Sequence, residues 1–184
     1  MSVVSPFRTQ ALRGWLRHAR ALPRASARGQ ALVEFAAVLL PLMLVVVAII
    51  QFGFLFSAYI GTSNAAREGA RSGTIYVYDN SGSHDQTWND KARCALILAA
   101  AQQSLDAGVP GQFSGSCATA SGGGDLAISY PDAATCTNMP RTGCQMRVVL
   151  TYRQPLFVPL VGAFLQADAQ NRVALTASVT MVVN

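Results

Sequence analysis

The chain has 184 residues, which allows one soluble domain of ordinary size beside a membrane segment. Only 12% of the residues are charged and the mean hydropathy is positive, as in a membrane-anchored chain. The net charge of +5 arises before Gly29, where six arginines and no acidic residue lie; eight basic and nine acidic residues follow. The basic character therefore belongs to the first 29 residues and not to a binding face, which argues against nucleic acid as a partner.

The residues before Gly29 form a basic leader. Because Lys and Arg that flank a membrane helix stay on the cytoplasmic side, the leader predicts an N-terminus inside and a C-terminus outside. It is either a disordered segment that fixes this orientation, which we favour, or an amphipathic helix on an anionic membrane surface. A mitochondrial presequence has a similar composition but does not explain the apolar stretch that follows.

An uncharged stretch covers residues 35–66, and its densest part, residues 35–58, is almost wholly apolar. A helix needs about 20 residues to cross the hydrocarbon core of a bilayer, whereas the apolar region of a cleaved secretory signal has about 7–15. We therefore expect one continuous helix over residues 30–72. Pro41 lacks an amide proton, which predicts a kink or a local loosening of this helix.

The rest of the chain predicts a small α+β head. A helix is expected over residues 86–107, with Asp85 as its N-cap and Gly108 as its C-cap. One predicted face of this helix is marked by Ala92, Leu96, Ala99, Ala100 and Gln103. Its apolar side is widened by Trp88, Ala95, Leu98 and Leu105.

Alternating apolar residues predict three strands, at residues 125–130, 145–152 and 172–183, which would form a short antiparallel sheet with the helix on one face. The apolar residues 156–165 are too few to span a bilayer. They form either a short helix packed on the sheet or a segment at the membrane interface.

Four cysteines, Cys94, Cys117, Cys136 and Cys144, all lie in the part predicted to be outside. An even number in an exported segment indicates two disulfides, and the spacings match no zinc-binding pattern, so no metal is expected. Of the three possible pairings we favour Cys94–Cys117, which would tie the helix to the glycine-rich loop, and Cys136–Cys144, which would close the loop before a strand.

The sharpest motif is a glycine, Gly29, followed after four residues by Glu34 at the head of the apolar helix. It resembles the processing site of type IV prepilins, in which a membrane peptidase cuts after the glycine. Glycine leaves the scissile backbone uncrowded, and the cut would free an α-ammonium at Gln30. Glu34 would then pair with this cation or with that of a neighbouring subunit, because an unpaired carboxylate in lipid is costly. Alternatively, Glu34 lies at the headgroup boundary of an ordinary signal anchor.

Residues 28–73 resemble the TadE-like family, the pseudopilins of the tight-adherence (Flp) pilus system. The matching pieces are Arg28-Gly29-Gln30, Val33-Glu34-Phe35-Ala36, Leu40-Pro41, Phe52-Gly53 and Asn64-Ala65-Ala66-Arg67-Glu68-Gly69-Ala70-Arg71. Residues 151–162 are more loosely similar to the far end of these proteins. Gln51 departs from the family pattern, in which an acidic residue often precedes the Phe-Gly pair.

Small residues follow the apolar stretch at helical spacing: Ala66, Gly69, Ala70 and Gly73. They would allow another helix, or the head itself, to approach closely, with Glu68 paired to a neighbouring arginine. The alternative is a solvated helix with ordinary charge pairs.

These observations predict a pilin-like α+β protein in three parts: a removable leader at residues 1–29, a transmembrane and juxtamembrane helix at 30–73, and an extracytoplasmic, disulfide-tied head at 74–184. No catalytic triad, metalloprotease motif or phosphate-binding loop occurs in the sequence, so neither an enzyme nor a cofactor is expected.

The resemblance implies a minor pilin in the bacterial inner membrane, needed for pilus assembly, adhesion and surface colonisation. Its implied partners are a prepilin peptidase, other pilins and pseudopilins, the inner-membrane assembly platform and membrane lipid. The resemblance also allows incorporation into an extracellular pilus. The alternative is an uncleaved, signal-anchored binding protein or adhesin.

Overall fold

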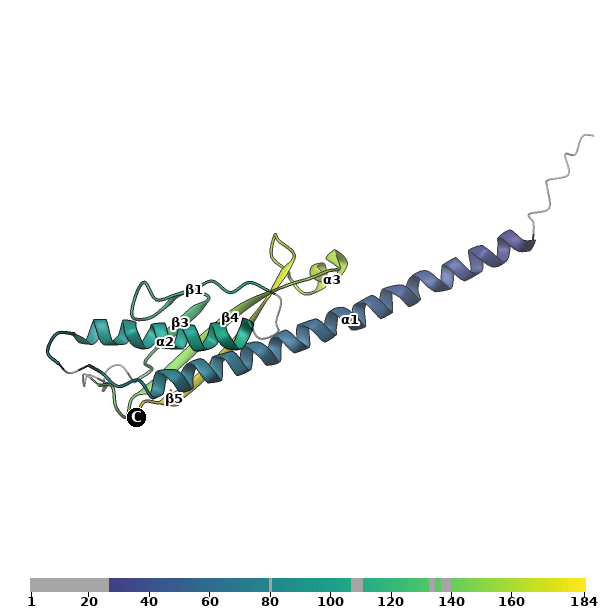
Figure 1. The fold of residues 1–184 in the computed structure, drawn as a ribbon. Helices are drawn as coiled ribbons and strands as arrows, with labels where there is room; N and C mark the ends of the chain where they lie inside the picture. The colour runs from purple at the N-terminus through teal and green to yellow at the C-terminus, as the bar shows by residue number, and fades with distance from the viewer. Residues whose placement is uncertain (1–26, 80, 107–110, 133–134, 137–139) are drawn as a thin grey trace, which may run out of the picture. The chain divides into compact units, whose positions relative to one another are not determined.

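The computed structural model describes residues 27–79, 81–106, 111–132, 135–136 and 140–184, so the predicted leader, except for its last three residues, and the predicted C-cap Gly108 lie outside it. The chain divides into two compact units, Met1–Met43 and Leu44–Asn184. The helices are α1 (Ala27–Thr74), α2 (Gln86–Asp106) and α3 (Pro159–Phe164); the strands are β1 (Gly115–Ser116), β2 (Gly123–Gly124), β3 (Leu126–Ser129), β4 (Gln145–Pro155) and β5 (Arg172–Val182) (Figure 1).

The predicted long helix is confirmed as α1, which runs without a break past Pro41. In the first unit, every described residue from Gly29 to Met43 is exposed, although the sequence there is apolar after Glu34. Within the described part of the chain, α1 is the one helix long and apolar enough to cross a membrane. Its length and its exposed apolar surface fit a membrane anchor.

The second unit contains a three-stranded antiparallel sheet in the order β3-β4-β5, with β4 at its centre. Val148 of β4 lies opposite Ile128 of β3 and Val179 of β5. Alternate residues of β4, from Met146 to Gln154, are buried, so one face of the sheet forms the core. The three predicted strands are confirmed, and β4 extends to Pro155 because its pairing with β5 continues to that residue.

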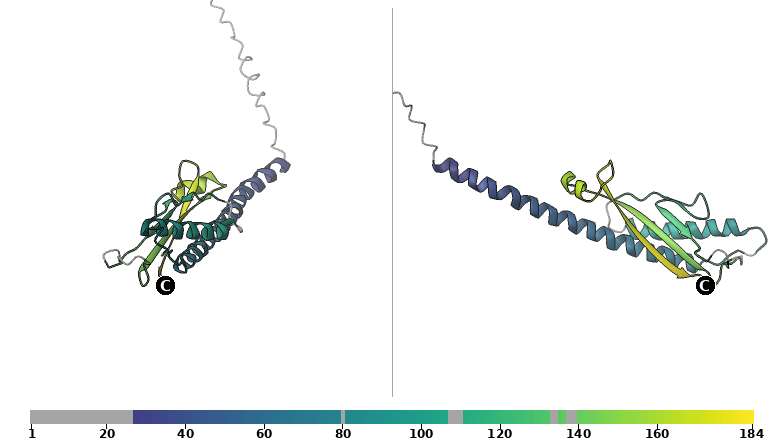
Figure 2. Two further views of the ribbon diagram at one scale, coloured as in Figure 1. Left: turned by 60° about the vertical axis from the view of Figure 1, so that its left-hand side comes forward. Right: turned by 180° about the vertical axis from the view of Figure 1, so that it is seen from behind.

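The core lies where α1, α2 and this sheet meet, and Figure 2 shows α2 running beside the later part of α1. At Gly73 an added Cβ would lie 2.7 Å from both Ile97 Cδ1 of α2 and Met146 Cε of β4. At Gly69 it would lie 3.2 Å from the Ile97 carbonyl oxygen. The small residues therefore let α1 contact its own head. This confirms the close approach predicted for the stretch and excludes a helix that is solvated on all sides.

The predicted apolar side of α2 is wrong for most of its residues, since of them only Leu105 is buried and Leu98 packs against the core. The helix is confirmed, and so is its N-cap, because the Trp88 amide donates to Asp85 Oδ1 at 2.7 Å. Four residues of the predicted face instead line an open hollow beside the end of α1: Leu96, Ala99, Ala100 and Gln103. The buried side contains these residues: Asn89, Asp90, Arg93, Cys94, Ile97, Ala101 and Leu105. Three of the seven are polar, so the count of apolar residues favoured the other side.

We predict that Gly73→Leu destabilises the head, because the new side chain enters space already filled by Ile97 and Met146. Overpacking of this kind costs about 1–3 kcal/mol and should lower the melting temperature of the full-length protein in detergent by several degrees. Gly53→Leu is the matched control, since nothing lies within 4 Å of a Cβ at that position. Equal melting temperatures for the two variants would contradict the packing described for α1.

Candidate functional site

The first candidate site is the start of α1, where Gly29, Gln30 and Glu34 are all exposed. Gln30 Nε2 donates to Glu34 Oε1 at 3.0 Å, one helical turn away. A Cβ at Gly29 would meet nothing within 4 Å in the described structure. The Gly29–Gln30 peptide bond is thus uncovered in the described structure, and it lies in helical backbone because α1 begins at Ala27.

A second polar group of α1, Gln51, belongs to the other unit and has a different environment. Its side chain is 1% exposed, and its Oε1 accepts a 2.8 Å hydrogen bond from the Phe157 amide. Its Nε2 is buried and has no hydrogen-bond partner in the described structure. Gln51, which the sequence showed only as a departure from a family pattern, therefore fixes the chain before α3 to α1. The sequence signal that could have revealed this contact is the single carboxamide within the apolar residues 35–58, because a buried polar group needs a hydrogen-bond partner.

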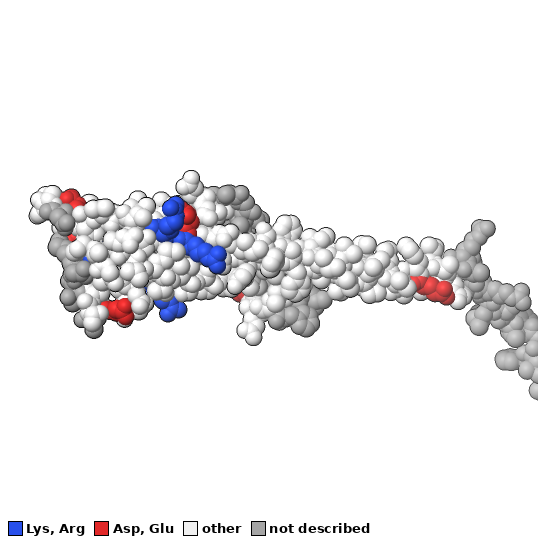
Figure 3. Space-filling model, turned by 90° about the horizontal axis from the view of Figure 1, so that it is seen from below, with Lys and Arg blue, Asp and Glu red and all other residues white. Residues whose placement is uncertain are grey.

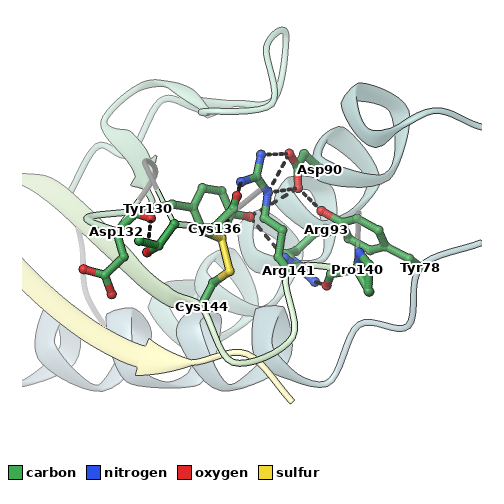
Figure 4. Close-up of a disulfide and its surroundings, with 10 residues drawn as sticks. Tyr78, Asp90, Arg93, Tyr130, Asp132, Cys136, Pro140, Arg141 and Cys144 are labelled. Atoms are coloured by element: carbon green, nitrogen blue, oxygen red, sulfur yellow. Dashed lines mark hydrogen bonds and ion pairs between the residues drawn. A yellow bond between two sulfur atoms is a disulfide. The ribbon is translucent and has the colours of Figure 1, made fainter. Parts of the chain in front are cut away.

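The head contains a buried ion pair between Asp90 of α2 and Arg141, which lies in the loop before β4 (Figure 4). Arg141 Nη2 is 2.7 Å from Asp90 Oδ2, and Arg141 Nε is 3.0 Å from both carboxylate oxygens. The Tyr78 hydroxyl also donates to Asp90. The side chain of Asp90 is 5% exposed, so this carboxylate depends on these donors in place of water.

A second arginine, Arg93, lies beside this pair and is almost fully buried. It donates to the Tyr130 hydroxyl at 3.1 Å and to the Pro140 carbonyl at 3.4 Å. Its guanidinium carbon is 4.6 Å from the centre of the Tyr78 ring, a distance suited to a cation–π contact. Together these contacts join α2 to the segment after α1 and to the loop before β4.

The electrostatics of the cluster favour one protonation state. Burial raises the pKa of Tyr78, and its hydrogen bond to Asp90 raises it further, so the hydroxyl stays a donor. The hydrogen bond to Asp90 raises the pKa of Arg141. Both shifts move the pKa values further above pH 7, so Tyr78 stays neutral and Arg141 stays charged, which fits a structural role better than proton transfer.

Two disulfides join Cys94 to Cys117 and Cys136 to Cys144, the pairing that the sequence analysis favours. The second closes the loop that carries Arg141, whose Nη1 also donates to the Cys136 carbonyl at 3.3 Å. Among the residues that the structure describes, no group of three His, Cys, Asp or Glu side chains is placed to hold a metal ion.

Comparison with known protein families gives one result: residues 29–71 match the family model described as TadE-like protein. This stretch is a TadE-like segment. The match begins at Gly29, includes Glu34 and Pro41, and ends before the sheet and the disulfides of the head. No curated protein and no solved structure matches the chain. The TadE-like segment suggests a protein associated with a tight-adherence (Tad) pilus.

We predict that Arg141→Ala destabilises the head by about 3 kcal/mol, because it leaves the Asp90 carboxylate buried with fewer donors. The unfolding free energy in urea, followed by circular dichroism, measures this loss. Arg71→Ala is the control: it breaks the Arg71–Glu68 pair, whose partners are 66% and 45% exposed, and should change stability little. Similar losses in the two variants would contradict the role given to the buried pair.

Proposed function

We propose that this protein is a minor pilin (pseudopilin) of a tight-adherence pilus, made as a prepilin and cut after Gly29 by a prepilin peptidase. The observation that carries the proposal is the TadE-like match, which begins at Gly29 and continues through the exposed apolar part of α1. The basic leader, the exposed glycine and the glutamate one turn after Gln30 all suit this role.

The proposed division of the chain follows from the same role. The leader, residues 1–29, stays on the cytoplasmic side and is removed. Residues 30–73 anchor the protein in the inner membrane, and the head, residues 74–184, lies outside, where an oxidising environment maintains its two disulfides. Its partners are the peptidase, the inner-membrane assembly platform and other pilins, and its role is in pilus assembly, adhesion and surface colonisation.

The exposed apolar surface of α1 suggests how such a subunit would move between lipid and pilus. Lipid tails and apolar side chains of another pilin are similar in polarity, so the exchange brings little hydrophobic gain. Polar groups then decide the register of the helices. In the uncut chain, the Gln30 carboxamide occupies one oxygen of Glu34; after the cut, the α-ammonium of Gln30 becomes a stronger donor for Glu34 of this or a neighbouring chain.

Processing is tested by the N-terminal sequence and intact mass of the membrane-extracted protein. We expect a chain that begins at Gln30 in cells that contain the peptidase, and full-length protein for Gly29→Arg, since an arginine side chain obstructs the cut. Gly14→Arg adds the same charge to the leader away from the cleavage site and should leave processing intact. Full-length wild-type protein, or normal processing of Gly29→Arg, would instead favour the uncleaved, signal-anchored binding protein or adhesin.

The pairing role of Glu34 is tested separately. We expect Glu34→Leu to be cut normally but to be about tenfold less abundant in sheared pili, because one lost charge pair weakens assembly. Quantitative immunoblotting of pilus and membrane fractions measures the ratio, with Val33→Leu as the neighbouring control. Wild-type amounts of Glu34→Leu in the pilus fraction would contradict the pairing while leaving the processing result unaffected.

A further inference from the structure

Exposed aromatic residues, here called the exit patch, surround α1 on both sides of the stripe that the head covers, within the second unit. Its exposed members are Phe52, Phe54, Phe56, Tyr59 and Phe157. We propose that the exit patch inserts into the outer interface of the membrane, so that the head rests directly on lipid. This inference rests on the proposed membrane anchoring and goes beyond it, because it assigns a lipid-binding surface to the head.

The residue count places the exit patch at the right depth. Phe54 follows Glu34 by 20 residues, about the number that a helix needs to cross the hydrocarbon core. If Glu34 lies at the cytoplasmic boundary, the helix leaves the lipid tails near Phe54. The next charged residue is Arg67, so no charge hinders burial of this region in the interface. Figure 3 shows a long uncharged part of α1, drawn in white, on the face in view.

The head is already attached to α1 at this level. From Gln51 onward, one side of the helix is buried at a spacing of three or four residues: Gln51, Leu55, Ala58 and Thr62. The Phe157 amide donates to Gln51, and the Phe157 ring meets the Phe54 ring edge-on at 5.5 Å between centroids. The backbone at Phe157 is thus fixed beside α1, while its side chain remains 64% exposed.

The chemistry of the surrounding surface favours lipid as the occupant. The exposed aromatic residues continue the exposed apolar surface of α1 directly, and rings with one polar edge, such as Tyr59, are typical of the membrane–water interface. Residues 154–167, which include α3, contain no charged residue. Polar contacts follow directly in the chain: Arg172 Nε pairs with Asp168 Oδ2 at 2.9 Å, and Asn171 Nδ2 donates to the Leu156 carbonyl at 2.8 Å. Polar groups of this kind suit the headgroup layer of a membrane.

Quenching of a single tryptophan by brominated lipid tests the proposal in the full-length protein, reconstituted in phosphatidylcholine vesicles at a low protein-to-lipid ratio. Trp15 and Trp88 are replaced by Phe, and Phe157→Trp supplies the reporter, which keeps the backbone bond to Gln51. We expect bromine placed high on the acyl chain to remove about half of its fluorescence, and bromine near the bilayer centre to remove less.

Two matched reporters separate the possible outcomes. Native Trp88, kept in a Trp15→Phe variant, is 45% exposed at the start of α2, which lies at the end of the head away from α3 (Figures 1 and 2), and it should not be quenched. Leu44→Trp, midway between Glu34 and Phe54, should be quenched most by bromine near the bilayer centre. Intact mass under non-reducing conditions checks that both disulfides are present in each variant.

The quenching of the three reporters distinguishes lipid contact of the head from membrane anchoring alone. Quenching of Leu44→Trp with none of Phe157→Trp would overturn the lipid contact of the head while leaving the anchor in place. If Leu44→Trp also escapes quenching, the membrane anchoring itself is wrong, and the exit patch has no lipid to enter. Quenching of both reporters at their expected depths, with Trp88 unchanged, supports the proposal.

Discussion

The close approach of α1 to α2 is the contact on which the rest of the head depends. Glycines at positions 69 and 73 remove the side chains that would separate the helices, and Ile97 fills the space that they leave. Met146 reaches the same point from β4, so the helix pair and the sheet share one contact. This packing gives the later part of α1 a buried side, while the earlier part is apolar and exposed. One continuous helix therefore supplies both an element of the core and a surface that fits a membrane anchor.

The buried charges of α2 attach irregular segments of the chain to a small core. Asp90 and Arg93 lie on α2, yet their partners come from the residues after α1 and from the loop before β4. The Cys136–Cys144 disulfide limits the freedom of that loop and keeps Arg141 close to Asp90. Because a buried ion pair adds little net stability but is costly to break, its main effect is to exclude other arrangements of these segments.

The sequence was sufficient for the elements that have strong local signals. The uncharged stretch predicted α1, Asp85 marked the start of α2, and alternation predicted β4 and β5. It was insufficient where burial depends on partners distant in the chain. Arg93 appears polar in any count of apolar faces, yet it is buried, and Tyr130 and Pro140, 37 and 47 residues away, accept hydrogen bonds from its two Nη atoms. Gln51 was recognised as unusual, but its partner Phe157, 106 residues away, was not predictable.

Gln51 and Glu34 show how a polar group can be retained in an apolar helix for different reasons. Gln51 already has a partner within its own unit, so its oxygen is satisfied before any assembly begins. Glu34 is exposed, and within the described residues it accepts a hydrogen bond from the neutral carboxamide of Gln30, which leaves it available for a stronger donor. A carboxylate at position 51 would accept the Phe157 amide equally well, but it would add a charge at the level of the exit patch. The neutral carboxamide keeps that contact and leaves Glu34 as the one acidic side chain in residues 30–67.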